Sequence, residues 1–317
     1  MNTSTSQTTS NEVTELRLPE NESSRKPGQS SNWFINLFFI LICGFIVVPF
    51  VLVIAISLSS EQSITQNGFR FIPEQFSFEA YRIVFEVPRT IIRAYGVTIF
   101  ITVVGTVISL LMTALMAYPI SRKDFRYNRP LTFYVFFTML FNGGMIPFYI
   151  LMTQYLHLND TLAALIIPLL LSPFNILIMK GFLDKISLEI IESAKIDGAR
   201  EFRIFFRIIL PLSTPALATL GLFIAFAYWN DWYNALLFID SDKYVPLQLL
   251  LVRIITKVEF LANSPFATAA DKLKYASFPT MSVRMAMAIV AGGPMLFIFP
   301  FFQRYFVRGI SVGSLKG

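Results

Sequence analysis

Several residue types that build common functional sites are scarce in this 317-residue chain. It has one cysteine, Cys43, and one histidine, His157, so neither a disulfide framework nor a His/Cys metal cluster is available within it. His157 lies in a short polar stretch and is interpreted as a solvated loop residue. No G-x-x-x-x-G-K-[ST] phosphate loop occurs. The long apolar runs also lack paired carboxylates and a nucleophile–base arrangement, which argues against a membrane enzyme.

Charge is scarce as well. Charged residues make up 15% of the chain, against about 25% in ordinary soluble domains, whereas 55% of the residues are hydrophobic and 33 are Phe. This composition predicts an integral membrane protein. The net charge of +6 comes from basic residues that gather in short loops beside apolar runs. Membrane orientation explains that distribution, so no nucleic-acid site is predicted.

We predict an all-α protein with six transmembrane helices, since about 20 apolar residues cross the hydrocarbon core. The third span is predicted to be broken by Asn142-Gly143-Gly144 and Pro147, and the sixth to be interrupted at Gly292-Gly293-Pro294, while the fourth contains Pro173 near its middle. The glycine pairs leave two interpretations open, close helix packing or local unwinding toward a cavity. The predicted spans are approximately residues 33–58, 95–120, 131–152, 162–180, 214–239 and 283–306, with long outer loops at 59–90 and 240–281.

Residues 1–32 are rich in Ser, Thr, Asn, Gln and Glu and are predicted to form a disordered cytoplasmic tail rather than a signal peptide. The transmembrane domain then covers residues 33–317. The short loop at 121–130 is basic, while the loop at 153–161 has no Lys or Arg. This contrast predicts that both termini lie in the cytoplasm, although the long outer loops also carry basic residues.

The densest charge lies in loop 187–211, which separates two predicted spans. Its pattern predicts two short helices: Ser187 is a candidate N-cap, and Asp197-Gly198 is a helix stop. The second helix places one apolar face against the membrane domain and one basic face opposite. The apolar face consists of Phe202, Phe205, Phe206 and Ile209, and the basic face of Arg200, Arg203 and Arg207.

The spacing of Glu192, Ala194, Gly198, Ile208, Leu210 and Pro211 resembles the E-A-A-x3-G-x9-I-x-L-P motif of permease subunits from binding-protein-dependent ABC importers. Ser193 stands where that family usually has Ala. The resemblance implies a type I ABC importer permease fold, with its core at about residues 90–310 and a cytoplasmic coupling helix that docks on an ATPase. The coupling residues that it implies are Glu192, Ser193, Ala194, Lys195, Asp197, Gly198, Ala199 and Arg200.

Two further segments resemble permeases of known importers and bear on the transported substrate. Residues 309–317 and the block Asn142–Pro147 resemble permeases of carbohydrate importers, the block pointing to the oligosaccharide branch. Asp231 is the acidic residue placed within a span, beside aromatic and amide side chains that suit a sugar. An interfacial aromatic belt is the alternative. The candidate substrate pathway is Trp229, Asn230, Asp231, Trp232, Asn234, Asn142, Gly143 and Asn175.

The resemblance therefore implies a permease subunit of an ATP-driven importer that moves a sugar, an oligosaccharide first of all, across a bacterial plasma membrane by alternating access. The implied partners are a second homologous permease, two ATPase subunits that bind ATP and Mg²⁺, an extracytoplasmic solute-binding protein and membrane lipid. No cofactor is expected in this chain. An amino-acid or peptide importer is the alternative, and an integral membrane enzyme is a remote one.

Overall fold

The computed structural model describes residues 29–86, 88–263 and 279–314. The chain divides into two compact units, residues 1–51 and 52–317, and each is described by itself. Most of the predicted disordered tail therefore lies outside the described residues. Helix α1 (Gln29–Ser57) begins a few residues before the predicted span and includes Pro49. Its segment Trp33–Ser57 is long and apolar enough to cross a membrane.

Three helices in the described part of the chain meet the length and hydropathy of a membrane span, namely α1, α4 (Pro88–Ser121) and the first part of α16 (Thr280–Ser314). Three further pairs meet it together but are sharply bent, so the described residues hold three candidate spans, or up to six. In the first pair, α5 (Asn128–Leu140) is followed by α6 (Met145–Ile150) and η1 (Leu151–Tyr155), with a bend of 107°. In the second, α7 (Leu162–Ile166) and η2 (Ile167–Leu169) are followed by α8 (Pro173–Leu183), with a bend of 51°. In the third, α10 (Glu201–Ile204), η3 (Phe205–Ile209) and α11 (Leu210–Leu212) are followed by α12 (Thr214–Trp229), with a bend of 78°.

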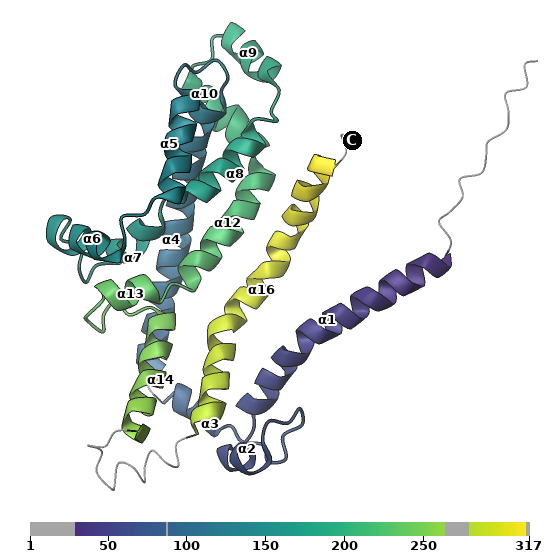
Figure 1. Cartoon of the computed structure of the whole chain (residues 1–317), viewed down its shortest axis with the longest axis vertical. Helices are drawn as coiled ribbons and strands as arrows, with labels where there is room; N and C mark the ends of the chain where they lie inside the picture. Colours follow the sequence, from purple (N-terminus) through teal and green to yellow (C-terminus); the bar gives the residue numbers. More distant parts are fainter. Residues whose placement is uncertain (1–28, 87, 264–278, 315–317) are drawn as a thin grey trace, which may run out of the picture. The chain divides into compact units, whose positions relative to one another are not determined.

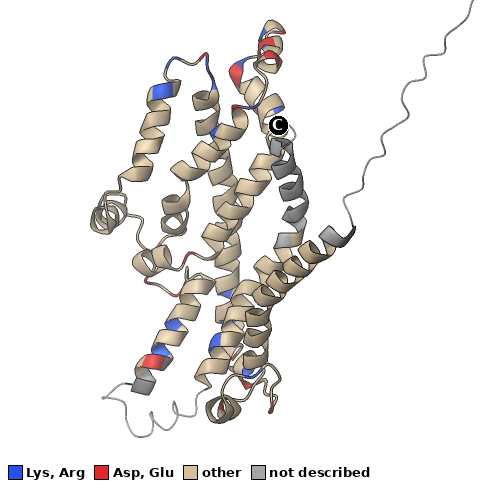
Figure 2. Ribbon diagram, turned by 45° about the vertical axis from the view of Figure 1, so that its right-hand side comes forward, with Lys and Arg blue, Asp and Glu red and all other residues tan. Residues whose placement is uncertain are grey.

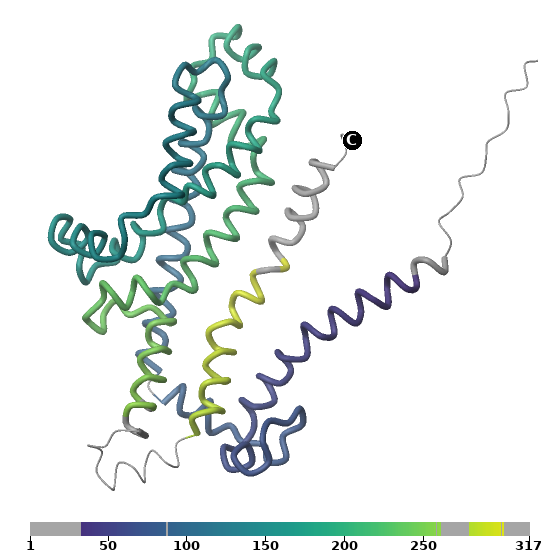
Figure 3. The backbone as a smooth tube through the Cα atoms, viewed as in Figure 1, coloured from purple at the N-terminus to yellow at the C-terminus, as the bar shows by residue number. Residues whose placement is uncertain are grey.

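The sharpest bend falls at the predicted Asn-Gly-Gly interruption, where the tube in Figure 3 turns abruptly between α5 and α6. Gly144 has a φ of +88°, a conformation that favours glycine because it has no Cβ. The Asn142 side chain accepts a hydrogen bond from the Gly144 amide at 2.8 Å, which fixes the turn. The predicted break of the third span is therefore present at this glycine pair.

The second glycine pair behaves differently. Helix α16 runs continuously through Gly292-Gly293-Pro294, so the predicted interruption of the last span is wrong. Proline removes one backbone donor, but neighbouring groups and small adjustments accommodate it within membrane helices. The predicted fifth span is also divided, because α12 ends at Trp229 and α13 (Tyr233–Phe238) follows after a short break.

The predicted outer loops contain helices that the sequence reading omitted. Residues 59–90 include α2 (Glu61–Asn67) and α3 (Glu79–Val84), and residues 240–281 include the 17-residue α14 (Leu247–Asn263). Isolated polar and charged residues interrupt the apolar pattern of α14, which made this amphipathic segment look like a loop.

The core of the second unit forms where α4, α8 and α12 pack together (Figure 1). Ala114 and Ala117 of α4 are fully buried, and Tyr228 of α12 is 1% exposed. Gly105 of α4 lies against the Tyr228 ring, where a Cβ would come within 2.5 Å of Cζ. Figure 2 shows that charged residues gather toward the two ends of this helical unit, as the transfer cost of charge into lipid requires.

Candidate functional site

Loop 187–211 begins with helix α9 (Leu188–Ile196), whose two ends are built as the sequence predicts. The Ser187 hydroxyl accepts the Glu189 amide at 3.3 Å, which confirms the N-cap. At the other end, the Gly198 amide bonds to the Lys195 carbonyl and the Ala199 amide to the Ala194 carbonyl. This pair of bonds is a Schellman motif, and Gly198 takes the left-handed position with a φ of +75°.

The second arm of the loop departs from the predicted face. Ile204, Phe205 and Ile209 are buried, but Phe202 is 75% exposed and Phe206 is 46% exposed. The predicted packing of Phe202 against the membrane domain is therefore wrong. The i, i+3, i+4, i+7 pattern assumes a regular α-helix, whereas Phe205–Ile209 is π-helical. A π turn holds an extra residue, which rotates the preceding residues away from the original face.

Two apolar side chains consequently stand out on the loop. Ile196 ends α9 and is 86% exposed, and Phe202 follows the Gly198 turn. The predicted coupling residues divide between this surface and the interior. Glu192, Ser193, Lys195, Asp197, Gly198 and Arg200 are exposed, whereas Ala194 is buried and Ala199 is half-buried. The inward residues anchor α9, and the outward ones form a mixed charged and apolar surface.

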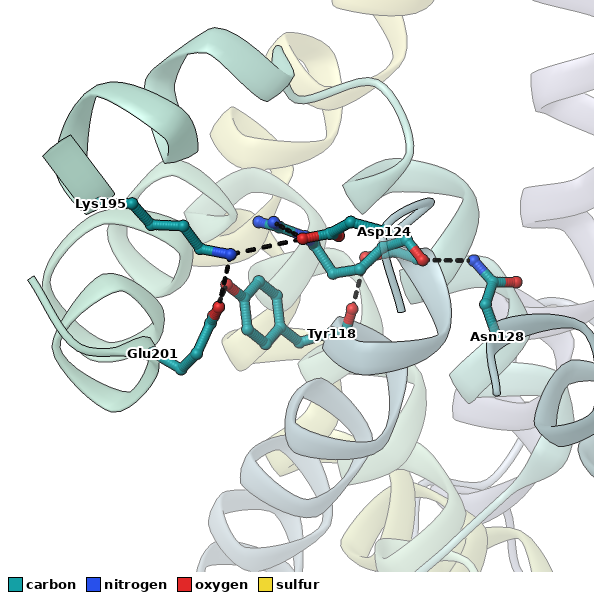
Figure 4. A network of polar contacts seen from close by, with 7 residues as sticks. Tyr118, Asp124, Asn128, Lys195 and Glu201 are labelled. Atoms are coloured by element: carbon teal, nitrogen blue, oxygen red, sulfur yellow. Dashed lines mark hydrogen bonds and ion pairs between the residues drawn. The ribbon is translucent and has the colours of Figure 1, made fainter. Parts of the chain in front are cut away.

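A polar network ties α9 to the end of α4 (Figure 4). The Lys195 ammonium lies 2.8 Å from Glu201 Oε1 and 3.3 Å from Asp124 Oδ2. Tyr118, one turn before the end of α4, donates its hydroxyl to Glu201 Oε2 at 2.9 Å. Arg122 binds Asp124 through two N–H groups, from Nε at 2.9 Å and from Nη2 at 2.7 Å. The network joins four segments of the chain.

Charge pairing within this network shifts the ionisation of its members. Hydrogen bonds from Arg122, followed by that from Lys195, hold the pKa of Asp124 well below its ordinary value. The hydrogen bond to Glu201, and then the one to Asp124, raises the pKa of Lys195. These groups are charged at neutral pH, so the network is a set of ion pairs on a partly solvated surface.

Sequence reasoning missed most of this network. It predicted a role for Lys195 but counted the loop after α4 only for its positive charge, so Asp124 received no role. Glu201 and Tyr118 were likewise not singled out. The one available signal was an acidic residue in a strongly basic loop, because such a residue usually has a partner nearby.

The second predicted region, residues 229–234, spans the break between α12 and α13. Asp231 accepts hydrogen bonds from the Asn234 amide at 3.1 Å and from its Nδ2 at 2.9 Å, so it orders the start of α13. Trp232 and Tyr233 are about half exposed and pack edge to face. The Tyr233 hydroxyl lies 2.7 Å from Met145 Sδ, which brings this break beside the Asn142-Gly143-Gly144 turn.

The other predicted pathway residues differ in their surroundings. Trp229 is 3% exposed, and its indole donates to the Ala291 carbonyl at 2.9 Å, so its rings pack between α12 and α16 instead of standing free for a sugar. Asn230 is exposed and contacts Gln248 of α14 at 3.4 Å, a polar neighbour that the sequence did not suggest. Asn175 is half-buried on α8.

Comparison with known families decides what this helical unit is. Residues 109–312 match the model of the binding-protein-dependent transport system inner membrane component. The chain belongs to this family. The match includes loop 187–211, residues 229–234 and most of α16, and it confirms that the permease resemblance seen in the loop extends over residues 109–312.

Alignments with named relatives extend over most of the chain. This chain is 42% identical to protein LplC of Bacillus subtilis (strain 168) over 86% of this chain and 90% of that protein. It is 40% identical to the polygalacturonan/rhamnogalacturonan transport system permease protein YtcP of the same organism, over 89% and 95%. The second relative is named as a transport system permease. With the family match, this shows that the chain is a permease subunit, as predicted, and not an enzyme.

A solved structure agrees with the fold of the permease. A chain from the crystal structure of a bacterial ABC transporter involved in the import of the acidic polysaccharide alginate superimposes with a TM-score of 0.73 and 31% identity. The match covers 89% of this chain and 99% of the other. The prediction of an all-α membrane protein with an ABC importer permease fold is therefore confirmed.

Proposed function

We propose that this permease carries an oligosaccharide through the cytoplasmic membrane of a bacterium, in an importer driven by partner ATPase subunits that bind ATP and Mg²⁺. The observation that supports the cargo is the full-length similarity to a permease named for polygalacturonan and rhamnogalacturonan and to an alginate importer. Both names describe acidic saccharides, which makes acidic oligosaccharides the first class to test. A solute-binding protein and a second homologous permease complete the proposed assembly.

The docking surface for the ATPase is, in this proposal, the outward side of α9 and the turn that follows it. Ile196 is 86% and Phe202 is 75% exposed, and charged residues flank both of them in the sequence of this loop. An apolar centre with a polar rim is the usual anatomy of a protein interface. Loop 187–211 and both chain termini then lie on the cytoplasmic side.

Alternating access follows from how this loop is held. Closure of the ATPase dimer on ATP would move α9, and the Lys195–Asp124–Glu201 contacts would pass that motion to α4. Phe205 and Ile209, the buried residues of the π turn, would pass it to α12. Hydrolysis would then restore the first arrangement. The proposed path for the sugar runs past Asn230, Asp231, Trp232 and Asn234 and past the turn at Asn142 and Gly143, with Asn175 on α8 as a further candidate.

The docking proposal is tested by copurification of the tagged chain with its ATPase and second permease. We expect Ile196→Asp combined with Phe202→Ser to lose the ATPase while still inserting into the membrane. The matched control is Ile72→Asp with Phe71→Ser, since Ile72 is 78% and Phe71 is 54% exposed in the outer segment between α2 and α3. Retention of the ATPase by the first pair would contradict the assignment.

The pathway proposal is tested by uptake of radiolabelled oligogalacturonides, alginate oligomers and neutral oligosaccharides. Asn230→Ala and Asp231→Ala should reduce uptake of the transported class while ATPase activity continues, because the altered groups contact cargo and not the ATPase. Trp229→Phe, which keeps an aromatic ring in the α12–α16 contact, is the control. Unchanged transport kinetics in the two variants would remove both residues from the path.

A further inference from the structure

A polar cavity of about 290 Å³ lies at the end of α4, between that helix, the segment joining α8 to α9, and α9 itself. Its polar lining includes Ser121, Arg122, Lys123, Lys185 and Ser187. Its apolar wall includes Leu183, Ile191 and Ile209, all of them at most 5% exposed. The cavity therefore has a cationic rim above a fixed hydrocarbon wall, and the proposed import function assigns it no role.

The positive charge at the rim is not neutralised within the part of the chain that the structure describes. Lys123 and Lys185 are exposed, and neither ammonium has an ion pair or hydrogen bond to a described residue. The acidic residue that lines the cavity, Asp184, is bound by Lys180 at 2.7 Å. Two uncompensated cations thus face the same small volume, and an anion is the ligand that this arrangement favours.

Arg122 adds a second, independent observation. Its side chain is 7% exposed, and Asp124 satisfies its Nε and Nη2. Its Nη1 is buried and has no hydrogen-bond partner among the described residues. A buried donor without an acceptor costs free energy, and each such group in a folded protein calls for a specific explanation. An oxygen-rich anion that enters the cavity supplies acceptors beside this guanidinium.

The lining of the cavity and the proposed topology indicate which anion. Arg122 directly follows α4, a candidate membrane span that ends at Ser121. In the proposed topology this end of α4 is on the cytoplasmic side, where membranes carry anionic lipids, and basic pockets between membrane helices bind anionic head groups. The apolar wall of Leu183 and Ile191 suits the acyl end of the same molecule better than it suits a free ion or an acidic protein side chain.

We propose that this cavity binds the phosphate of an anionic phospholipid, with Lys123 and Lys185 at the rim and Arg122 beneath it. A lipid held there contacts Ser187 and the first turn of α9, so it stabilises the start of the loop on which the ATPase is proposed to dock. The binding depends on the membrane location of the chain and not on the identity of the sugar.

The test is native mass spectrometry of the full-length chain in nonionic detergent, titrated with phosphatidylglycerol or phosphatidylcholine. We expect the wild type to prefer phosphatidylglycerol. Lys123→Gln with Lys185→Gln should weaken that binding about 30-fold, the value of two lysine charges at a lipid surface, and leave phosphatidylcholine binding unchanged. Lys123→Arg with Lys185→Arg should retain it. The charge-matched control is Arg126→Gln with Arg203→Gln, two exposed residues outside the cavity.

Three results would overturn the proposal. The first is equal phosphatidylglycerol binding by wild type and the Lys123/Lys185 glutamine variant, which would leave the charges without a lipid role. The second is displacement of the lipid by millimolar inorganic phosphate, which would indicate a site for soluble anions. The third is loss of ATPase copurification by the glutamine variant without a change in lipid binding, which would assign the cavity to an acidic group of the partner protein.

Discussion

At the residue scale, Gly198 is a position where the backbone conformation disfavours most residues other than glycine. Its φ of +75° belongs to the left-handed region, and an added Cβ would meet nothing within 4 Å. A substitution there is therefore opposed by backbone strain alone, about 1–2 kcal/mol for most L-residues. Asparagine tolerates this conformation better than alanine, so the two substitutions separate strain from side-chain contact.

For Gly198 we expect a graded loss of coupling, measured as the ratio of sugar uptake to ATP hydrolysis. Gly198→Asn should retain most coupling and Gly198→Ala less. Gly198→Pro should still insert while uncoupling hydrolysis from uptake, because proline fixes φ near −65° and removes the amide that bonds to Lys195. Normal transport by the proline variant would argue against a coupling role for this turn.

A second residue-scale prediction concerns Asp124, whose pKa is lowered in the folded protein by Arg122 and Lys195. The ion pairs should stabilise the fold fully above the ordinary aspartate pKa of about 3.9 and progressively less as the pH falls below it. Asp124→Asn should thus lower the free energy of unfolding at neutral pH by less than about 1 kcal/mol, because the carboxylate is half solvated. A lower thermal midpoint in detergent measures this loss.

The difference between Asp124→Asn and wild type should shrink as the pH is lowered past about 4. Asp197→Asn is the control, because Asp197 lies in loop 187–211, two residues from the Lys195 that contacts Asp124, is exposed, and makes no side-chain ion pair with a described residue. A difference that stays constant from neutral to acid pH would show that shape, and not charge, accounts for the effect of the Asp124 substitution.

At the scale of elements, the contact of α4 with α12 depends on the absence of one side chain. An alanine Cβ at Gly105 would lie 2.5 Å from Cζ and 2.7 Å from both Cε atoms of Tyr228. Tyr228 is 1% exposed and donates its hydroxyl to the Ile166 carbonyl at 2.8 Å, so the ring has little freedom to move.

We therefore expect Gly105→Ala to destabilise the helix pair by about 1–3 kcal/mol, the usual cost of overpacking. A shift in thermal midpoint measures it. Gly96→Ala, on the same helix with nothing within 4 Å of the added Cβ, should have no such effect. Adding Tyr228→Leu should recover part of the Gly105→Ala loss if the ring is its cause; independent, additive losses would locate the strain elsewhere.

The elements also show where sequence patterns mislead. Phe202 fits the apolar face of a regular helix, but the π turn that follows rotates it outward. Gly292-Gly293-Pro294 has the composition of a break, yet α16 continues through it. Asn142-Gly143-Gly144 does turn, because Gly144 takes a positive φ and Asn142 holds the turn with its side chain. A pattern predicts a break reliably only when a local bond also favours one.

At the scale of the whole molecule, the open prediction is orientation. Cys43 is the single cysteine, so Cys43→Ser gives a background free of thiols. In that background we expect Gln66→Cys, in α2, to react with a membrane-impermeant maleimide in intact cells, because the proposed topology puts α2 outside. Ser193→Cys, in α9, should react only after permeabilisation. Labelling of Ser193→Cys in intact cells would invert the topology and remove α9 from the ATPase.

The sequence by itself determined the class of this protein and the turn at its candidate docking loop. Long apolar runs are costly to expose to water and charges are costly to place in lipid, so composition alone indicated the membrane. The Ser187 cap and the Gly198 stop involve residues only a few positions apart. Such signals are local, so they can be read from the sequence without knowledge of the fold.

Tertiary structure alone decided which side chains meet. The Lys195 contacts with Asp124 and Glu201, the burial of Trp229 against α16, and the cavity beside Arg122 join segments far apart in the chain. Hydrophobic periodicity in the sequence does not predict such contacts. They depend on where the helices bend and cross one another, which many residues determine together. The physical reason is that burial and ion pairing act through space, whereas propensity and capping act along the backbone.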